Sequence, residues 1–251
     1  MKKLGILGGV AWPSTIDYYR AICRMSVARH VHESLPGPPA VPEMSIESLN
    51  INKSYGLRGG TITDDVSWAK YDQYFREALQ RLEAGGAELA IIASSTPHNR
   101  LSAITQGIRI PVLGIFEAVA QECAQLGVKE VLILGTAPTM DAPVFSEALS
   151  RFGVRGYAPR LAEERVKLTA LVSELYAGHG VDAASRLRSI VDNSCPKTSP
   201  IRTVCLACTE LPMAFPAIEQ EASLVIDGIC YVNSTIVHAR AAFAAICSSE
   251  A

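Results

Sequence analysis

The sequence predicts an α/β protein whose strands form one parallel sheet or two. Along its 251 residues, short apolar runs alternate with amphipathic stretches, a pattern typical of βαβ units. Four of the apolar runs end in small, hydroxyl or thiol residues just before a predicted helix, after Leu7, Ala93, Leu134 and Ala207. Because parallel strands present their carboxyl ends at one edge of a sheet, these residues are expected to line a polar cleft.

The individual elements follow from hydrophobic periodicity and from turn residues. Strands are predicted over residues 3–7, 44–46, 88–93, 108–113, 131–134, 201–204 and 225–227. Helices are predicted over residues 16–20, 64–84, 116–126, 168–176, 183–191 and 234–246. We expect Ser14 and Thr15 to cap the first helix. The glycine-rich residues 50–63 are expected to be irregular, either a flap or a loose connection.

Composition and charge indicate a soluble protein. The formal net charge is -2 and no basic run occurs, so neither nucleic acid nor an anionic membrane is indicated as a partner. The apolar N-terminal stretch is broken by Gly8 and Gly9, unlike a signal peptide, and no run approaches the ~20 apolar residues that span a bilayer. Seven cysteines in a chain of this length are typical of reduced thiols. We therefore expect a cytoplasmic protein.

The motifs for common cofactors are incomplete. Gly5, Gly8 and Gly9 do not have the spacing of a dinucleotide-binding fingerprint. Cys205 and Cys208 form a C-x-x-C motif without a second such motif or a nearby histidine pair, which argues against zinc. Cys205 belongs to a predicted strand that would point it into the core, which argues against a redox pair. No cofactor and no metal is expected.

Cys208 is the strongest candidate for chemistry. It follows the predicted strand over residues 201–204, where the next helix is expected to begin. The positive end of a helix lowers the pKa of a thiol and favours the nucleophilic, basic thiolate. The alternative is a buried, inert structural cysteine.

Five segments, in order along nearly the whole chain, resemble the cofactor-independent aspartate/glutamate racemase family. Residues 8–15 are similar to the first-turn motif of its amino-acid racemase branch, and residues 94–98 occupy the place of its Cys-Asn-Thr-x-His. Residues 134–140 resemble the turn of the second lobe, and residues 163–167 the segment with a substrate-contacting lysine. Residues 207–210 resemble the family's Gly-Cys-Thr-Glu.

The resemblance implies two similar Rossmann-like lobes related by a pseudo-twofold, with the active site in the cleft between them. The N-terminal lobe would comprise residues 1–113 plus 222–251, and the C-terminal lobe residues 114–221. It also implies a homodimer that takes a small amino acid or carboxylic acid as substrate, without pyridoxal phosphate or metal. In the family, one thiolate removes the Cα proton and a second thiol delivers one to the opposite face.

Carried over residue by residue, the resemblance assigns the two catalytic positions to Cys208 and Ser94. Side-chain hydroxyls and backbone N–H groups would hold the α-carboxylate and stabilise enediolate charge. The substrate-binding candidates are Gly9, Trp12, Ser14, Thr15, Tyr55, Ser95, Thr96, Thr136, Thr139, Lys167, Ala207 and Thr209. The supporting residues are His98, an activator of Ser94 or a locally bonded histidine, Glu210, an orienting acid, and His238, a brace of the site.

The departures from the family pattern concern mechanism and specificity. Ser94 replaces the first thiol and Ser95 the neighbouring asparagine. Because a serine hydroxyl is a far weaker acid than a thiol, a symmetric two-base mechanism is not expected, although the branch includes members with threonine there. Tyr55 falls near the flap position where relatives carry Arg or Gln for the distal carboxylate, and Lys53 or Arg58 could replace it.

Three functions fit these residues. The first is an amino-acid racemase for an acidic or related substrate, with Cys208 as the main acid/base. The second is a single-thiol enzyme that only protonates an enediolate, as arylmalonate-type decarboxylases do, or a related cis–trans isomerase. The third is a non-catalytic protein that has kept the fold and the carboxylate cradle.

Overall fold

The computed structural model describes residues 1–195 and 202–248, and the chain divides into two compact units. The first unit comprises Met1–Gly114 together with the residues from His238 on, and the second comprises Ile115–Val237. Each unit contains its own sheet with parallel strands, which confirms the predicted α/β fold class. Residue Ile201, at the start of the predicted strand 201–204, lies outside the described residues.

The first unit is built on a four-stranded sheet in the order β2-β1-β3-β4, with every neighbouring pair parallel. Its strands are β1 (Leu4–Gly8), β2 (Met44–Ser48), β3 (Leu89–Ile92) and β4 (Val112–Leu113). Its helices are α1 (Trp12–His32), α2 (Ile51–Gly56), α3 (Asp65–Ala84), the 3-10 helix η1 (Thr96–Arg100) and α4 (Leu101–Ile104). α10 (Ser234–Cys247) begins in the second unit and continues into the first.

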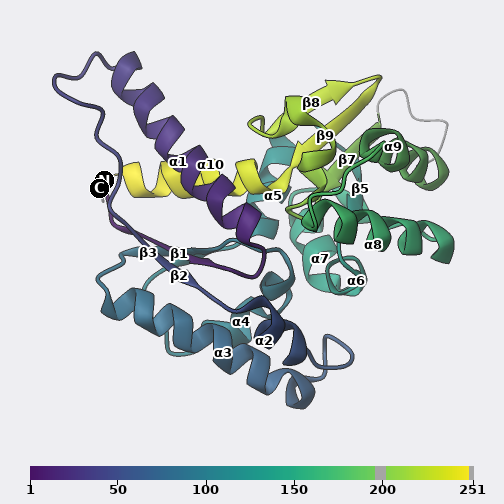
Figure 1. Ribbon diagram of the computed structural model, residues 1–251, viewed down its shortest axis with the longest axis horizontal. Helices are drawn as coiled ribbons and strands as arrows, with labels where there is room; N and C mark the ends of the chain where they lie inside the picture. The colour runs from purple at the N-terminus through teal and green to yellow at the C-terminus, as the bar shows by residue number, and fades with distance from the viewer. Residues whose placement is uncertain (196–201, 249–251) are drawn as a thin grey trace. The chain divides into compact units, whose positions relative to one another are not determined.

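Helices cover both faces of this sheet, as parallel sheets require. On one face, Ile6 of β1 packs with Tyr18 of α1 and Ala242 of α10. On the other face, Leu7 packs with Phe75 and other residues of α3. Figure 1 shows the same arrangement, with α1 and α10 on one side of β1–β3 and α3 on the other. Burial on both faces explains why the strands are continuous apolar runs rather than alternating ones.

The start of α1 differs from the prediction. The helix begins at Trp12, and its N-cap, Ala11, makes no side-chain hydrogen bond. Ser14 and Thr15 therefore lie inside the first turn and are not caps. The Ser14 hydroxyl contacts the carbonyl oxygens of Ala11 (2.8 Å) and Ala93 (2.9 Å), which ties the helix start to the end of β3.

The glycine-rich segment is also more ordered than expected, because α2 occupies its first half. The side chain of Asn50 accepts a hydrogen bond from the N–H of Lys53 at 3.0 Å and so caps this helix. Only residues 57–64 form the connection to α3.

Two buried histidines lie where α10 meets the ends of β3 and β4. The carbonyl of Leu113 can only accept, so His238 donates from Nε2 (3.1 Å) and its Nδ1 accepts the hydroxyl of Tyr18 (2.8 Å). His98 likewise donates from Nε2 to the carbonyl of Ile92 (3.2 Å), and its ring lies edge-on to that of His238, 5.4 Å between centroids. Burial lowers the pKa of His98 to about 4 and that of His238 to about 3.

These histidines should make the first unit sensitive to acid. Their unfolded pKa is about 6.5, so below that pH the unfolded chain binds protons that the folded protein excludes, and stability falls as pH drops toward 4. The expected slope is about 1.4 kcal/mol per pH unit for each histidine.

Urea unfolding between pH 7.5 and 5 should show this slope, and His238→Gln should reduce it by about half. His32→Gln, at an exposed position, is the matched control and should leave the slope unchanged. An unaltered slope in His238→Gln would contradict the assignment.

The second unit is built on a five-stranded sheet in the order β6-β5-β7-β9-β8. Its strands are β5 (Glu130–Leu134), β6 (Arg155–Tyr157), β7 (Arg202–Leu206), β8 (Ser223–Ile226) and β9 (Ile229–Asn233). Its helices are α5 (Ile115–Gln125), α6 (Ala137–Asp141), α7 (Pro143–Arg151), α8 (Ala162–Tyr176), α9 (Ala183–Ser194) and the 3-10 helices η2 (Leu211–Ala214) and η3 (Pro216–Ile218). None of the helices in the described parts of either unit is long and apolar enough to cross a membrane.

The edge formed by β8 and β9 was not predicted. β8 runs antiparallel to β9, and Asp227 and Gly228 between them both have positive φ values, 47° and 74°. Two such residues form the tight turn that Asp-Gly favours between hairpin strands. The predicted late strand is therefore one arm of a hairpin. β6, α7 and β9 are also absent from the sequence prediction.

Candidate active site

The ends of β5 and β7 meet at one edge of the second unit's sheet. Leu134 and Leu206 are register partners, and the N–H of Ala207 donates to the carbonyl of Leu134 at 2.8 Å. A Cβ on Gly135 would lie 3.2 Å from the carbonyl oxygen of Ala207. A residue without a side chain therefore lets the two strand ends approach, and the residues that follow them share one small region.

Cys208 is the second residue after β7, and it contacts a carboxylate. The residue is buried, and its Sγ donates a hydrogen bond to Oε2 of Glu210 at 2.9 Å. The hydroxyl of Thr209 lies 3.3 Å from the same oxygen. One carboxylate oxygen thus orients both the thiol and its neighbouring hydroxyl.

The predicted helix after Cys208 is not present. The chain instead forms η2, a 3-10 helix of four residues, followed by η3, and Pro212 and Pro216 lie in the first turns of these two helices. Proline removes a backbone donor and disfavours a continuous α-helix. So short a helix aligns few peptide dipoles, so its end stabilises a thiolate less than the α-helix expected from the sequence would. The thiol does contact a charged group, the Glu210 carboxylate.

The end of β5 adds two hydroxyl groups to the same edge. Thr136 and Thr139 lie within 3.1 Å of each other through their Oγ1 atoms, and Thr139 is buried. Together with residues 207–210 they supply hydroxyl, thiol and carboxylate groups at adjacent strand ends. This edge can orient a small polar ligand and exchange a proton with it.

Lys167 lies in the first turns of α8, which packs against η2. Its Nζ donates to Oε1 of Glu164 at 2.7 Å, and the same oxygen accepts from the side chain of Asn193 at 3.1 Å. The hydrogen bond to Glu164 raises the pKa of Lys167. Glu164 is itself buried, so a fixed carboxylate holds a half-exposed ammonium group.

The first unit gathers its candidates at the ends of β1 and β3. Gly9 has a φ of +81°, and a Cβ there would lie 2.2 Å from the carbonyl oxygen of Leu49, so only glycine fits this turn. The N–H of Gly9 donates to Oγ1 of Thr15 at 3.0 Å. Ser94 and Ser95 follow β3 after Ala93, and both are buried. The Ser95 hydroxyl has no hydrogen-bond partner among the described residues. An unpartnered buried hydroxyl calls for an explanation, and a ligand is one.

The aromatic and basic candidates of this unit are more exposed. Trp12 and Tyr55 are 58% and 67% exposed. The Arg58 guanidinium lies over the Tyr55 ring, 4.7 Å from its centroid, and Arg58 Nε is buried without a partner among the described residues. Lys53 lies 4.4 Å above the ring of Tyr74.

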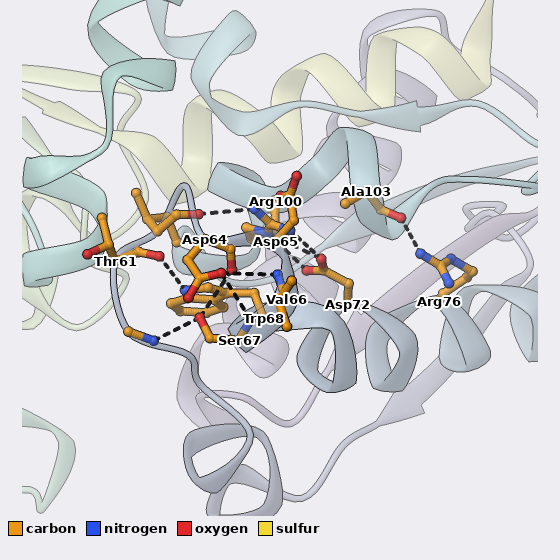
Figure 2. A network of polar contacts seen from close by, with 12 residues as sticks. Thr61, Asp64, Asp65, Val66, Ser67, Trp68, Asp72, Arg76, Arg100 and Ala103 are labelled. Carbon is orange, nitrogen blue, oxygen red and sulfur yellow. Dashed lines mark hydrogen bonds and ion pairs between the residues drawn. The ribbon is translucent and has the colours of Figure 1, made fainter.

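A buried ion pair connects these segments (Figure 2). Nη2 of Arg100 lies 2.6 Å from Asp72 of α3, and both side chains are almost fully buried. Nη1 of Arg100 contacts Asp65 (2.7 Å) and donates to the carbonyl of Ile62 (3.0 Å). Arg100 ends η1, the helix after Ser94 and Ser95, so one guanidinium holds that helix against both α3 and the 57–64 connection. The sequence held no signal for this pair, because the two residues are 28 positions apart.

Removing this cation should destabilise the first unit strongly. Arg100→Met would leave Asp72 buried and unpaired, and we expect a loss of about 3–5 kcal/mol in the free energy of unfolding measured with urea. Arg109→Met is the matched control. Arg109 also forms an ion pair, with Glu83, but its side chain is 86% exposed, so a loss of about 0–1 kcal/mol is expected. Equal losses in both variants would contradict a structural role for Arg100.

The remaining cysteine of the C-x-x-C motif lies in the core. Cys205 is fully buried in β7, and burial raises its pKa well above the usual value. All seven cysteines lie within the described ranges, and none of them forms a disulfide bond there. Within the two described ranges, no group of three or more His, Cys, Asp or Glu side chains is placed to hold a metal ion.

Fold and site define an α/β protein of two units, each with polar side chains at the carboxyl ends of its parallel strands. The family model for Asp/Glu/Hydantoin racemase matches residues 7–242. The chain belongs to this family. Residues 94–98 and 207–210 both lie inside the matched region.

Solved structures with the same fold come from archaea and bacteria. An aspartate racemase homologue from Pyrococcus horikoshii OT3 is 27% identical, with a TM-score of 0.75 over 99% of this chain and 100% of that one. A candidate Asp/Glu racemase from Yersinia pestis is 24% identical, with a TM-score of 0.77 and the same coverage. Aspartate racemase from Picrophilus torridus is 15% identical, with a TM-score of 0.71 over 98% of this chain and 94% of that chain. The last two show the fold alone.

Proposed function

We propose that this protein is a cofactor-independent amino-acid racemase in which Cys208 is the main acid/base. The observation that carries the proposal is the contact between the Cys208 thiol and the Glu210 carboxylate at the end of β7, in a chain of the Asp/Glu/Hydantoin racemase family. A thiol is well suited to Cα proton transfer, because its proton can leave and return near neutral pH.

The Cys208 thiol would first release its proton to solvent, and the resulting thiolate would take the Cα proton and leave a planar enediolate. Return of a proton to the opposite face completes inversion. Hydroxyl and backbone donors around the two sheet edges would stabilise the negative charge that develops on the carboxylate. In unit two these are Thr136, Thr139 and Thr209, with the backbone N–H groups of Cys208 and Thr209. The N–H of Ala207 is not among them, because it donates to the carbonyl of Leu134.

Glu210 would act as a positioning residue. It accepts the hydrogen bond from the thiol, so it fixes the direction in which the sulfur faces a substrate and keeps the proton on a defined path. Ser94 would take the second catalytic position, with Ser95 and Thr96 as donors to the carboxylate. Since a hydroxyl exchanges protons far less readily than a thiol, the two directions of racemisation should have unequal rates.

The substrate proposed is a small amino acid with an acidic or related side chain. The names of the structural relatives, aspartate racemases among them, support this class. Lys167 and the group formed by Arg58 and Tyr55 are the cationic and aromatic side chains that would recognise its carboxylates. Supporting roles are proposed for two histidines in their neutral forms: His98 braces the end of β3, and His238 braces the end of β4.

Removing the Cys208 thiol should abolish proton exchange at Cα. Single enantiomers of acidic amino acids and of a wider amino-acid panel are incubated in deuterated water, and Cα deuteration and optical rotation are followed. Cys208→Ala should lower the exchange rate by about 10²–10⁴-fold, the usual contribution of a general acid/base. Cys23→Ala is the matched control. Cys23 is a cysteine of α1 and lies outside the motif at residues 207–210, so this variant should keep the wild-type rate.

The same panel separates the other functions. If Cys208→Ala still exchanged the Cα proton at the wild-type rate, the proposed role of the thiol would be wrong. A single-thiol decarboxylase would be favoured if the protein released carbon dioxide from a disubstituted malonate and exchanged the Cα proton of no amino acid. The protonated Cys208 thiol, which donates a hydrogen bond to Glu210, supports this alternative. A non-catalytic protein would be favoured if the wild type turned over no substrate and Cys208→Ala still bound carboxylates.

Neutralising Glu210 should affect turnover more than binding. In Glu210→Gln the amide can still accept a hydrogen bond but carries no charge, so we expect kcat to fall about tenfold or more with little change in KM. The pH–rate profile should also shift, an effect that a purely structural residue would not produce. Glu219→Gln is the matched control, because Glu219 is exposed and lies further along the same stretch of chain. A profile identical to that of the wild type would contradict a role for Glu210.

A further inference from the structure

Glu164 is a buried carboxylate in the first turn of α8, and the proposed reaction uses only its partner, Lys167. The side chain of Glu164 is 1% exposed, whereas that of Lys167, 2.7 Å away, is 53% exposed. A buried charge is costly to leave unpaired, because it has lost its contact with water. The pair therefore joins a group that must stay paired to a cation that reaches solvent.

The contacts of Glu164 show why it holds Lys167 firmly. Its Oε1 accepts from both Lys167 and the side chain of Asn193, and its Oε2 is buried without a partner among the described residues. Asn193 is neutral, so Lys167 supplies the positive charge in this set of contacts. An ammonium group that moved away would leave the buried carboxylate without a counter-charge. Lys167 should therefore stay on Glu164 when a ligand binds, unlike a freely rotating surface lysine.

The backbone that carries Lys167 is fixed to the polar edge of the second unit's sheet. Leu168, the next residue, belongs to the same core cluster as Cys208. On the other side, Arg165 contacts Asp141 at 2.5 Å, and Asp141 is the last residue of α6, the short helix that follows β5. The start of α8 is thus held near the residues that follow both β5 and β7.

A lysine held in this way can bind a carboxylate at one position only. An ammonium group has three donors, and Glu164 takes one of them, which leaves two for a ligand. A mobile lysine would follow ligands of different lengths. With both its backbone and its Nζ held, Lys167 instead accepts a carboxylate at a set distance from the strand ends.

We propose that Glu164 determines substrate specificity: by holding Lys167 in place, it sets how far apart the two carboxylates of a substrate must be. Glu164 itself would be a positioning residue that acts through Lys167. This inference rests on the proposed recognition of a substrate carboxylate by Lys167, and it concerns binding rather than proton transfer.

Binding of a series of dicarboxylates to the full chain tests the inference. Malonate, succinate, glutarate and adipate each differ from the next by one methylene, and their Kd values are measured by isothermal titration calorimetry. The wild type should prefer one length over its neighbours by about tenfold or more, the usual effect of one methylene. Glu164→Gln removes the charge that holds the ammonium group, so the preference should fall to about threefold or less.

Glu163→Gln is the matched control for loss of charge. The pKa of Lys167 is raised first by its hydrogen bond to Glu164 and also by the charge of Glu163, which is exposed. Removing a negative charge should raise the affinity for all four anions alike, so the readout is the ratio of Kd values and not Kd itself. Glu163→Gln should keep the wild-type ratio.

Glu164→Asp keeps the charge and is the second variant. Its carboxylate is one methylene shorter, so it should draw the ammonium group back and shift the preference to a longer dicarboxylate. Urea midpoints show which variants are folded, and Glu164→Asp carries the test if Glu164→Gln does not fold. A merely structural role for Glu164 would change the midpoints without changing the length preference.

An unchanged length preference in either folded variant would overturn the inference. A wild type that binds no dicarboxylate, or binds all four equally, would overturn it as well. The racemase function is tested separately by Cα exchange. Binding with the expected preferences but without exchange of any amino acid would contradict the racemase proposal and support the role of Glu164.

Discussion

Close approach of backbone at the ends of parallel strands is the constraint on which both candidate sites depend. In the first unit, Gly9 turns with positive φ against the carbonyl of Leu49, where a side chain would overlap the backbone. In the second unit, Gly135 lets the end of β5 lie against Ala207. The first contact sets the end of β1 against the end of β2, and the second sets the end of β5 against the end of β7. The two polar sheet edges therefore depend on the glycines, which have no side chain, as much as on the residues with reactive side chains.

The two units supply different chemistry at these edges. In the first unit, the buried histidines remain neutral because burial opposes their protonation, and their donors are used by the carbonyls of Ile92 and Leu113. What remains at the end of β3 is hydroxyl groups. In the second unit, a thiol donates to a carboxylate. One edge is thus suited mainly to hydrogen bonding and the other to proton exchange, which is the physical basis for the unequal roles proposed for Ser94 and Cys208.

Local sequence patterns predicted the buried strands and the residues at their ends. The features that these patterns did not predict depend mostly on contacts between residues far apart in the sequence. β1, β3 and β5 are continuous apolar runs because both sheet faces are covered, and so their ends could be located from the sequence. The hairpin of β8 and β9 had a local signal, Asp227-Gly228, that the alternation of strands and helices obscured. The 3-10 helices after Cys208 had another in Pro212 and Pro216. The pairing of Arg100 with Asp72 and the thiol contact to one oxygen of Glu210 have no such signal, because side-chain geometry decides them.

The first turn of α1 links the strand ends to the rest of that helix. Ser14 contacts the carbonyl of Ala93, and Thr15 accepts from the N–H of Gly9, so the helix start is fixed to the ends of β3 and β1 by its polar side chains. Both contacts join a side chain of the first turn to backbone that follows a strand, so they hold the helix start in place without any ligand. A ligand that approached this turn would therefore meet groups whose positions are set by two strand ends, which lowers the cost of ordering the site on binding.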